Sequence, residues 1–392
     1  MAEEESRELK QLLLERVKLG HGLLSRCMGL EQRSIEGIGK LTRKIKAELK
    51  FLEMVKNKKS NDASYVKSTN LSHLQGVIKT VEEAEGVTAL FKSYYYHPAY
   101  SEADQVAISV DVVAKKGSNW IKVIARNPVA LHRIWQGEGN FGDRDLTEQA
   151  KELKECAVQN EVHFVSPIVV FSFQNGVTED VAKALLEIGV CVEGEVIGNP
   201  GEEKPTMELP KPDADQLGQE HKIYLLNLDV SSMIAYVSSV TNGGRDFIFR
   251  DSVLTCQAEK ELKDPLLPKL EEYCRGKELF ACKSAVTDFK SIIQTIGGEK
   301  EKERARRLLD RVSVVDDEPS PRALRLKESA SIRPRAKIVF GTGDTLKATT
   351  VTANAAFVRA AQNQGVEFSV LLHDSRALTE SKESTATPLS NE

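Results

Sequence analysis

The chain has 392 residues, of which 41% are hydrophobic and 29% are charged, so it has ample apolar material for a buried core. Its 54 Lys and Arg against 58 Asp and Glu give a net charge of −4, which excludes a uniformly basic nucleic-acid coat but not a local basic groove. No segment approaches the roughly 18 uninterrupted apolar residues of a membrane helix, and the first ten residues lack the features of a secretory signal. We therefore expect a soluble intracellular protein of the cytoplasm or the nucleus, with no membrane partner.

The first part of the chain, residues 1–98, is predicted to be a helical region. Leucines and isoleucines recur every three to four residues across residues 3–58, and Gly20 and Gly29 are expected to interrupt this pattern. Lysines and arginines crowd the second half of the stretch, which fits either a solvated helix face or a surface for RNA phosphates or a protein partner. A further helix is predicted at 73–95. These helices are expected to bind a protein partner or to cover a sheet.

The next part, residues 99–197, has the pattern of an α+β domain. Two β-rich runs, 106–113 and 120–125, flank Lys-Lys-Gly-Ser and predict a hairpin. After them the sequence predicts a helix at 146–159, a strand at 167–173, a helix at 179–187 and a strand at 190–196.

One pair of charged residues in the hairpin has two interpretations. Asp111 on its first strand and Lys122 on its second are placed to face each other. This pair resembles the core of restriction-endonuclease-like proteins, although no Glu-x-Lys motif is present. The alternative is a structural cross-strand ion pair.

Residues 198–220, GNPGEEKPTMELPKPDADQLGQE, are rich in Pro, Gly and acidic residues and are predicted to be a linker between domains. Beyond them, apolar runs alternate with helical patterns as far as residue 378. This alternation predicts an α/β domain, a parallel sheet with helices on both faces. Within it, residues 338–340 are expected to form a strand that enters the loop 341–344. The Ser- and Thr-rich residues 379–392 are predicted to be a flexible tail.

Polar residues follow several of these predicted strands. Asp229 comes directly after the first one, and Asn354 follows the strand that contains Thr352. Asp288 lies early in a predicted helix and Asp344 at another predicted helix start. Each residue type is typical of helix capping. Together, however, they would lie at the carboxyl ends of one parallel sheet. Clustered carboxylates repel one another unless a cation neutralises them, and hard oxygen ligands select Mg²⁺ or Mn²⁺.

The order of these motifs resembles the PIN (PilT N-terminus) nuclease family. The resemblance rests on DVS at 229–231, AVTDF at 285–289, DTL at 344–346 and TVTANAAF at 350–357, and it covers residues 221–378. The whole chain is also similar to an uncharacterised eukaryotic family of unknown function whose C-terminal domain is PIN-like.

The PIN resemblance implies a three-layer α/β/α domain and a metal-dependent endoribonuclease. In such enzymes metal-bound water attacks an RNA phosphodiester. Carried over by position, Asp229, Asp288 and Asp344 are the metal ligands, for Mg²⁺ or Mn²⁺, and Asn354 completes the catalytic set. Asp288 stands where the family usually has Glu, and Asn354 where an acid is common, which lowers the expected metal affinity. The alternative is a catalytically inactive RNA-binding or protein-interaction scaffold.

Two groups of side chains are the expected RNA contacts. The resemblance places Ser231 and Thr352 beside the acids. Arginines crowd the segment before Asp344, among them Arg307 and Arg335, and a guanidinium can donate two parallel hydrogen bonds to a phosphate. Acidic residues are interleaved with them, which equally fits an ion-paired helix surface.

Overall fold

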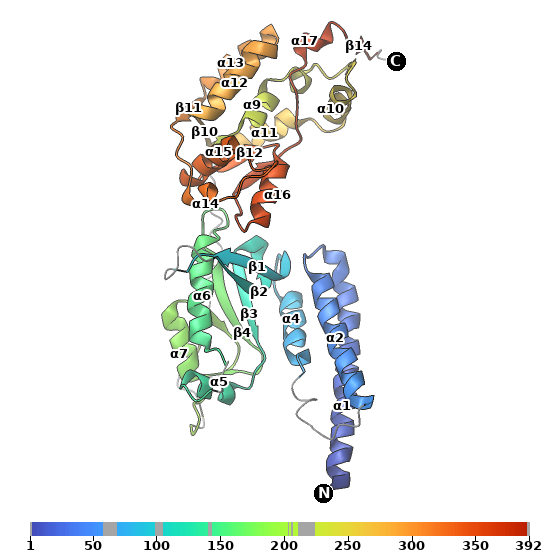
Figure 1. The fold of residues 1–392 in the computed structure, drawn as a ribbon, viewed down its shortest axis with the longest axis vertical. Helices are drawn as coiled ribbons and strands as arrows, with labels where there is room; N and C mark the ends of the chain where they lie inside the picture. The colour runs from blue at the N-terminus through green and yellow to red at the C-terminus, as the bar shows by residue number, and fades with distance from the viewer. Residues whose placement is uncertain are drawn as a thin grey trace. The chain divides into compact units, whose positions relative to one another are not determined.

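The computed structural model describes residues 2–57, 69–98, 105–139, 143–202, 204, 207–210 and 224–389. The chain forms two compact units: an N-terminal unit of residues 1–161 and 165–219, and a C-terminal unit of residues 162–164 and 220–392. Each unit contains a sheet with helices around it (Figure 1). The regions 1–98 and 99–197 fall in the same unit, and residues 211–220 of the predicted linker lie outside the described residues. Within the described residues, no helix is both long and apolar enough to cross a membrane.

Three long helices open the N-terminal unit: α1 (Ala2–Leu30), α2 (Ile38–Asn57) and α4 (Leu71–Glu83). Helix α1 continues through Gly20, where the sequence predicted an interruption. A Cβ on Gly20 would lie 2.6 Å from Cδ2 of Leu49, so the glycine allows α1 and α2 to pack closely. The apolar residues of the three helices share one core with Val112 and Ile121 of the sheet. These helices therefore cover one face of that sheet.

The sheet of the N-terminal unit has the strand order β1-β2-β3-β4-β6. Its strands are β1 (Ala89–Tyr96), β2 (Val106–Ala114), β3 (Asn119–Ile124), β4 (Ile168–Phe173) and β6 (Cys191–Glu193). The first three strands are antiparallel, which confirms the predicted hairpin, and β4 and β6 run parallel to β3. The helix predicted at 73–95 is wrong beyond Glu83, because residues 89–96 pair with β2.

The other face of this sheet is covered by α5 (Pro128–Trp135), α6 (Leu146–Gln159) and α7 (Glu179–Ile188). Helix α6 has the predicted bounds, and α7 differs by one residue at its end. Trp120 and Phe171 are fully buried beneath these helices. The sheet therefore lies between two layers of helices.

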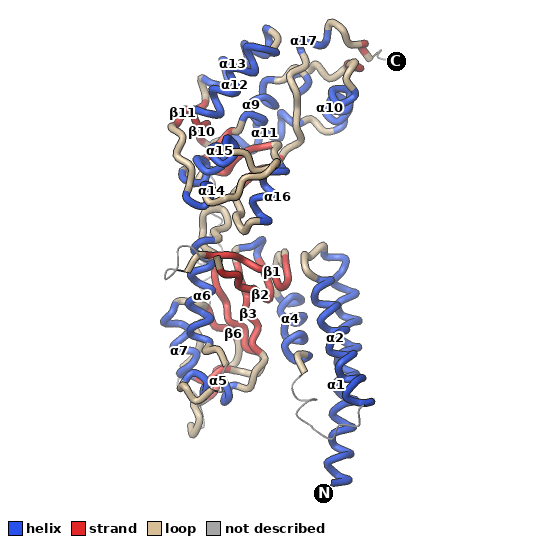
Figure 2. Tube along the Cα trace, in the orientation of Figure 1, coloured by secondary structure: helices blue, strands red, loops and turns tan. Residues whose placement is uncertain are grey.

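The C-terminal unit is built on a five-stranded, wholly parallel sheet in the order β11-β10-β8-β12-β13. The strands are β8 (Leu225–Leu228), β10 (Glu278–Cys282), β11 (Val312–Val315), β12 (Thr349–Thr352) and β13 (Val370–Leu372). Figure 2 distinguishes these strands from the helices that surround them. This arrangement confirms the expected three-layer α/β/α architecture.

The helices of the C-terminal unit alternate with its strands, as the sequence predicted. The main ones are α9 (Val230–Val237), α10 (Ser252–Lys263), α11 (Leu266–Cys274), α12 (Lys283–Ile296), α13 (Glu299–Leu309), α15 (Pro334–Thr345) and α16 (Ala355–Asn363). A short helix, α14 (Pro321–Leu324), precedes α15. Phe289, Phe340 and Phe357 are among the largest fully buried side chains of the core between helices and sheet.

The strand predicted at 338–340 is wrong, because these residues lie inside α15. The glycines that were expected to form a loop are helical, since the helix packs too closely for larger residues. A Cβ on Gly341 would lie 2.8 Å from the side chain of Ala323, and a Cβ on Gly343 would lie 2.6 Å from Nδ2 of Asn227. Tertiary packing here overrides the poor helix propensity of glycine.

The predicted flexible tail is packed onto the C-terminal unit as far as Leu389. It contains α17 (Glu380–Glu383) and β14 (Thr387–Pro388), and β14 pairs with β9 (Phe247–Ile248). Thr379 is fully buried, and its backbone N–H donates to the buried Glu301 carboxylate at 3.0 Å. A buried carboxylate that binds backbone N–H groups fixes this segment in place.

Candidate functional site

Asp229, Ser231 and Thr352 lie together at the carboxyl ends of the neighbouring strands β8 and β12. Asp229 is the buried N-cap of α9 and accepts a hydrogen bond from the backbone N–H of Ser232 at 2.7 Å. The Ser231 hydroxyl donates to Asp229 Oδ1 at 2.7 Å, and the Thr352 hydroxyl donates to Oδ2. Two hydrogen bonds of this group join the two strand ends: the one from Thr352 to Asp229, and one from the backbone N–H of Ala353 to Ser231 Oγ at 2.8 Å.

Asn354 follows the same strand but acts as a helix cap. Its side-chain Oδ1 accepts from the backbone N–H of Phe357 at 3.1 Å, in the first turn of α16. Its own N–H donates to Thr352 Oγ1 at 2.9 Å. The side-chain oxygen that a metal would use therefore already accepts a hydrogen bond from the helix.

Asp288 lies on α12 and is bound by Arg335, at the start of α15. Arg335 Nε lies 2.9 Å from Oδ2 of Asp288, and its Nη2 donates to Oδ1 at 3.2 Å. Ser284, in the first turn of α12, accepts from Arg335 and donates to Asp317. Burial opposes the charge on Asp317, but hydrogen bonds from Ser284 prevail and hold the pKa of its carboxyl below the ordinary value.

Asp344 is not at this edge of the sheet. It lies in the last turn of α15, shortly before β12 begins, whereas Asp229 follows the end of β8. Its carboxylate is 7% exposed and forms a bidentate pair with Arg322, whose Nε donates at 2.7 Å. The Arg322 guanidinium also lies over the ring of Phe368, which precedes β13. Asp344 was expected at the start of a helix and beside Asp229. This expectation is wrong, because Asp344 lies at the end of α15 and before β12, away from the end of β8.

The described residues include no group of three or more His, Cys, Asp or Glu side chains that could hold a metal ion. Asp288 and Asp344 each bind an arginine, and Asn354 caps a helix. These donors do not fit a shared Mg²⁺ or Mn²⁺ site in this arrangement, because a divalent ion would have to displace a guanidinium from each paired carboxylate. The metal stays a prediction from the resemblance.

His373 is a residue of this edge that the sequence analysis missed. It follows β13, and its backbone N–H donates to the carbonyl of Thr352 at 3.0 Å. Burial lowers the pKa of His373 in spite of the opposing effects of the Asp374 carbonyl and the Asp229 charge. Its Nε2 is buried, with no hydrogen-bond partner among the described residues. The signal was its position directly after an apolar strand, the same signal that identified Asp229.

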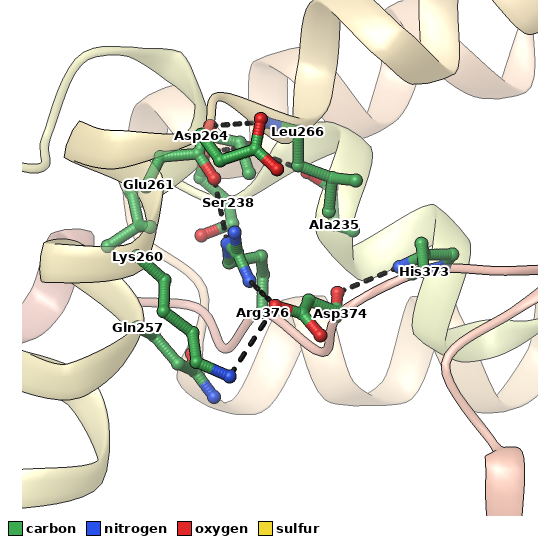
Figure 3. Close-up of polar contacts among 12 residues, drawn as sticks. Ala235, Ser238, Gln257, Lys260, Glu261, Asp264, Leu266, His373, Asp374 and Arg376 are labelled. Carbon is green, nitrogen blue, oxygen red and sulfur yellow. Dashed lines mark hydrogen bonds and ion pairs between the residues drawn. The ribbon is translucent and has the colours of Figure 1, made fainter. Parts of the chain in front are cut away.

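Close to His373, a buried ion pair joins the following loop to α10 (Figure 3). Arg376 Nε donates to Glu261 Oε2 at 2.8 Å, and the two side chains are 2% and 1% exposed. Glu261 Oε1 accepts from the backbone N–H of Leu266 at 2.8 Å. No oxygen of Glu261 is left free for a ligand, so this pair is structural.

The two predicted RNA-binding arginines differ in their surroundings. Arg307 is exposed on α13 and its Nε lies 3.0 Å from Glu303, one turn earlier, as expected of an ion-paired helix surface. Arg335 is the residue that binds Asp288 at the start of α15. Only Arg335 is therefore part of the polar group at the carboxyl ends of the strands.

In the N-terminal unit, Asp111 and Lys122 do face each other, with the carboxylate and Nζ 3.3 Å apart. Nε2 of His73, on α4, lies 3.7 Å from the same carboxylate. The sequence analysis did not identify His73, because no local pattern connects α4 with β2.

Two family models match the chain. The model described as "Family of unknown function (DUF5614)" matches residues 8–221, and the model described as "Protein of unknown function (DUF1308)" matches residues 226–387. The first match spans more than half of the chain, and the two matches divide it close to the boundary between the units.

Proposed function

We propose that this chain, which belongs to the family of unknown function DUF5614, carries a PIN-like C-terminal unit that binds RNA without cleaving it. The parallel sheet, with Asp229, Ser231 and Thr352 at its carboxyl ends, supports the PIN-like part of the proposal. The choice of RNA as the ligand follows from the same resemblance.

The ion pair between Arg335 and Asp288 carries the proposal that the unit does not cleave RNA. In a metal-dependent nuclease, the charge of the acids is balanced by the metal. Here a guanidinium balances Asp288 and another balances Asp344. A metal ion would have to break a charge-assisted bidentate pair to reach either carboxylate. The two arginine–carboxylate pairs therefore favour a surface without a bound metal ion over a metal centre.

A basic segment that contains Arg335 supports phosphate binding. Between Arg322 and Lys337 the chain has six basic residues and one acidic residue, Glu328. Arg325 and Arg333 are exposed there. Exposed guanidinium groups in excess over acids are suited to bind the phosphates of an RNA strand.

The first experiment measures binding of the full chain to a labelled single-stranded RNA by fluorescence anisotropy over a range of salt concentrations. Arg325→Glu combined with Arg333→Glu removes two phosphate contacts, so the slope of log K against log salt should fall by about 1.4. Arg306→Glu combined with Arg307→Glu, on the ion-paired face of α13, is the charge-matched control. An equal effect of both double variants would refute a specific role of the segment.

The second experiment tests cleavage. The same RNA, incubated with the full chain and Mn²⁺, should stay intact on a denaturing gel. The close grouping of Asp229, Ser231 and Thr352 favours one other candidate, a metal-dependent endoribonuclease. Cleavage by the wild type that Asp229→Asn abolishes, with circular dichroism showing that the variant is folded, would establish that candidate and overturn ours.

A further inference from the structure

In the N-terminal unit, strands β2 and β3 separate at Asp111. Their backbone pairing runs from Ala114 to Val112 on β2 and ends there. The Asp111 carboxylate then takes the place of a backbone acceptor and accepts from the N–H of Val123 at 3.0 Å. On the neighbouring strand β1, Phe91 has a left-handed backbone (φ 49°), an unfavourable conformation for a bulky residue. The regular sheet is interrupted at this point.

The carboxylate of Asp111 holds two basic side chains at the point where β2 and β3 separate. Lys122 Nζ and His73 Nε2 lie 3.3 and 3.7 Å from it. Burial opposes the charge on Asp111, but His73, Lys122 and the Val123 N–H prevail and hold its pKa below the ordinary value. Asp111 is only 6% exposed, whereas Lys122 and His73 are 24% and 28% exposed. Both basic side chains are therefore held in place and still accessible to a ligand.

These side chains line a cleft of about 760 Å³. The described residues that line it include three permanent cations, Lys44, Lys122 and Arg126, and one acid, Asp111. These four groups together give the lining a net charge of +2. A concave site with excess positive charge concentrates anions. Its volume lies within the range of about 300–1,000 Å³ that is usual for small-molecule sites.

The N-terminus of α4 lies at the cleft, where the backbone N–H of Asn70 donates to the Glu48 carboxylate at 3.2 Å and the N–H groups of the first turn follow it. Thr69, Asn70 and Ser72, at the start of this helix, are among the lining residues. Within the described residues, the side chain of Asn70 makes no capping hydrogen bond to the first turn, and Oγ1 of Thr69 is buried without a partner. Backbone N–H groups at a helix N-terminus form a favourable site for phosphate.

We propose that this cleft binds a phosphate-bearing small molecule of nucleotide size, with its phosphate between the N-terminus of α4 and Lys122. The excess of cations over acids in the lining selects an anion, and the one carboxylate of the lining is already paired with Lys122, which disfavours a metal ion. The inference concerns the N-terminal unit and does not depend on RNA binding by the C-terminal unit.

The test measures the thermal unfolding of the full chain by tryptophan fluorescence, since both tryptophans, Trp120 and Trp135, lie in the N-terminal unit. AMP and ATP should raise the unfolding temperature in proportion to the logarithm of their concentration, and adenosine, which lacks phosphate, should not. A 5′-phosphorylated oligonucleotide that stabilises the unit when AMP and ATP do not would overturn the small-molecule assignment. No stabilisation by any of these probes at millimolar concentration would overturn the site itself.

Variants in the cleft must change the affinity without disturbing Asp111. Arg126→Ala and Lys44→Met each remove one cation of the lining and should weaken AMP binding, measured by calorimetry, by about tenfold or more. Lys79→Met, an exposed lysine of α4 outside the lining residues, is the matched control and should bind AMP as the wild type does. Equal affinities in the two cleft variants and the wild type, or an equal loss in Lys79→Met, would refute the assignment.

The same calorimetry separates this inference from the proposed function. The double variant Arg325→Glu and Arg333→Glu, which should bind RNA weakly, should bind AMP as tightly as the wild type. A parallel loss of AMP and RNA affinity in that variant would place the nucleotide in the C-terminal unit and overturn the inference.

Discussion

Replacing Glu261 by Ala should strongly destabilise the C-terminal unit. The change leaves the guanidinium of Arg376, which is 2% exposed, without its carboxylate partner, and it removes the acceptor of the Leu266 N–H. Breaking one side of a buried ion pair costs about 3–5 kcal/mol of unfolding free energy. For a unit of this size, each kcal/mol corresponds to roughly 2–4 °C, so the unfolding temperature should fall by about 6–20 °C.

The adjacent residue provides the control. Lys260 lies 3.5 Å from Asp374, but the two side chains are 56% and 60% exposed, so Lys260→Ala should change the free energy of unfolding by about 0–1 kcal/mol. Replacing the buried pair as a whole, by Glu261→Leu with Arg376→Met, should recover most of the loss, because no charge is then left buried alone.

The assay is guanidinium unfolding of the full chain, followed by far-ultraviolet circular dichroism. Both tryptophans lie in the N-terminal unit, so their fluorescence reports on that unit and separates its transition from that of the C-terminal unit. A loss in Glu261→Ala no larger than in Lys260→Ala would refute the reasoning. A shift confined to the tryptophan signal would do so as well.

Three further measurements follow from the structure. Gly343→Ala should destabilise the C-terminal unit by about 1–3 kcal/mol in denaturant titrations, because the added Cβ would meet Asn227. Gly22→Ala lies in open space on α1 and should stabilise the N-terminal unit by about 0.5–1 kcal/mol. The pKa of Asp111 is lowered in the folded state, so its ionised form contributes stability above its unfolded pKa of about 3.9. The difference in unfolding free energy between the wild type and Asp111→Asn should therefore shrink as the pH falls below about 4, which denaturant titrations over a pH series would measure. Mn²⁺ at millimolar concentration should leave the unfolding temperature of the C-terminal unit unchanged; a rise that Asp229→Asn removes would contradict the proposal of a metal-free site.

The local pattern of the sequence was sufficient for many of the elements. The hairpin and α6 were predicted because their apolar periodicity reflects which side of each element is buried. The parallel sheet of the C-terminal unit followed from the alternation of strands and helices. Thr352 was expected beside Asp229 from the PIN resemblance, and the structure joins the two residues by a hydrogen bond.

Other features depended on packing between distant segments. Residues 338–340 were assigned to a strand because an apolar run followed by glycines has no local sign of a helix. Close packing of Gly341 against Ala323 and of Gly343 against Asn227 nevertheless requires those glycines within α15. The predicted helix 73–95 was likewise wrong over β1. Residues 89–96 form a strand because they pair with β2, which lies later in the chain.

The sequence by itself determined which residue types follow the strands, and the tertiary structure decided which partners they have. Asp288 meets an arginine 47 residues away and Asp344 one that is 22 residues away, separations that no helix or strand period connects. Asp111 likewise meets His73 only because α4 packs beside β2. The physical reason is that periodicity records the burial of a residue relative to its own helix or strand, whereas the neutralisation of a carboxylate depends on which distant side chain the fold brings within about 4 Å.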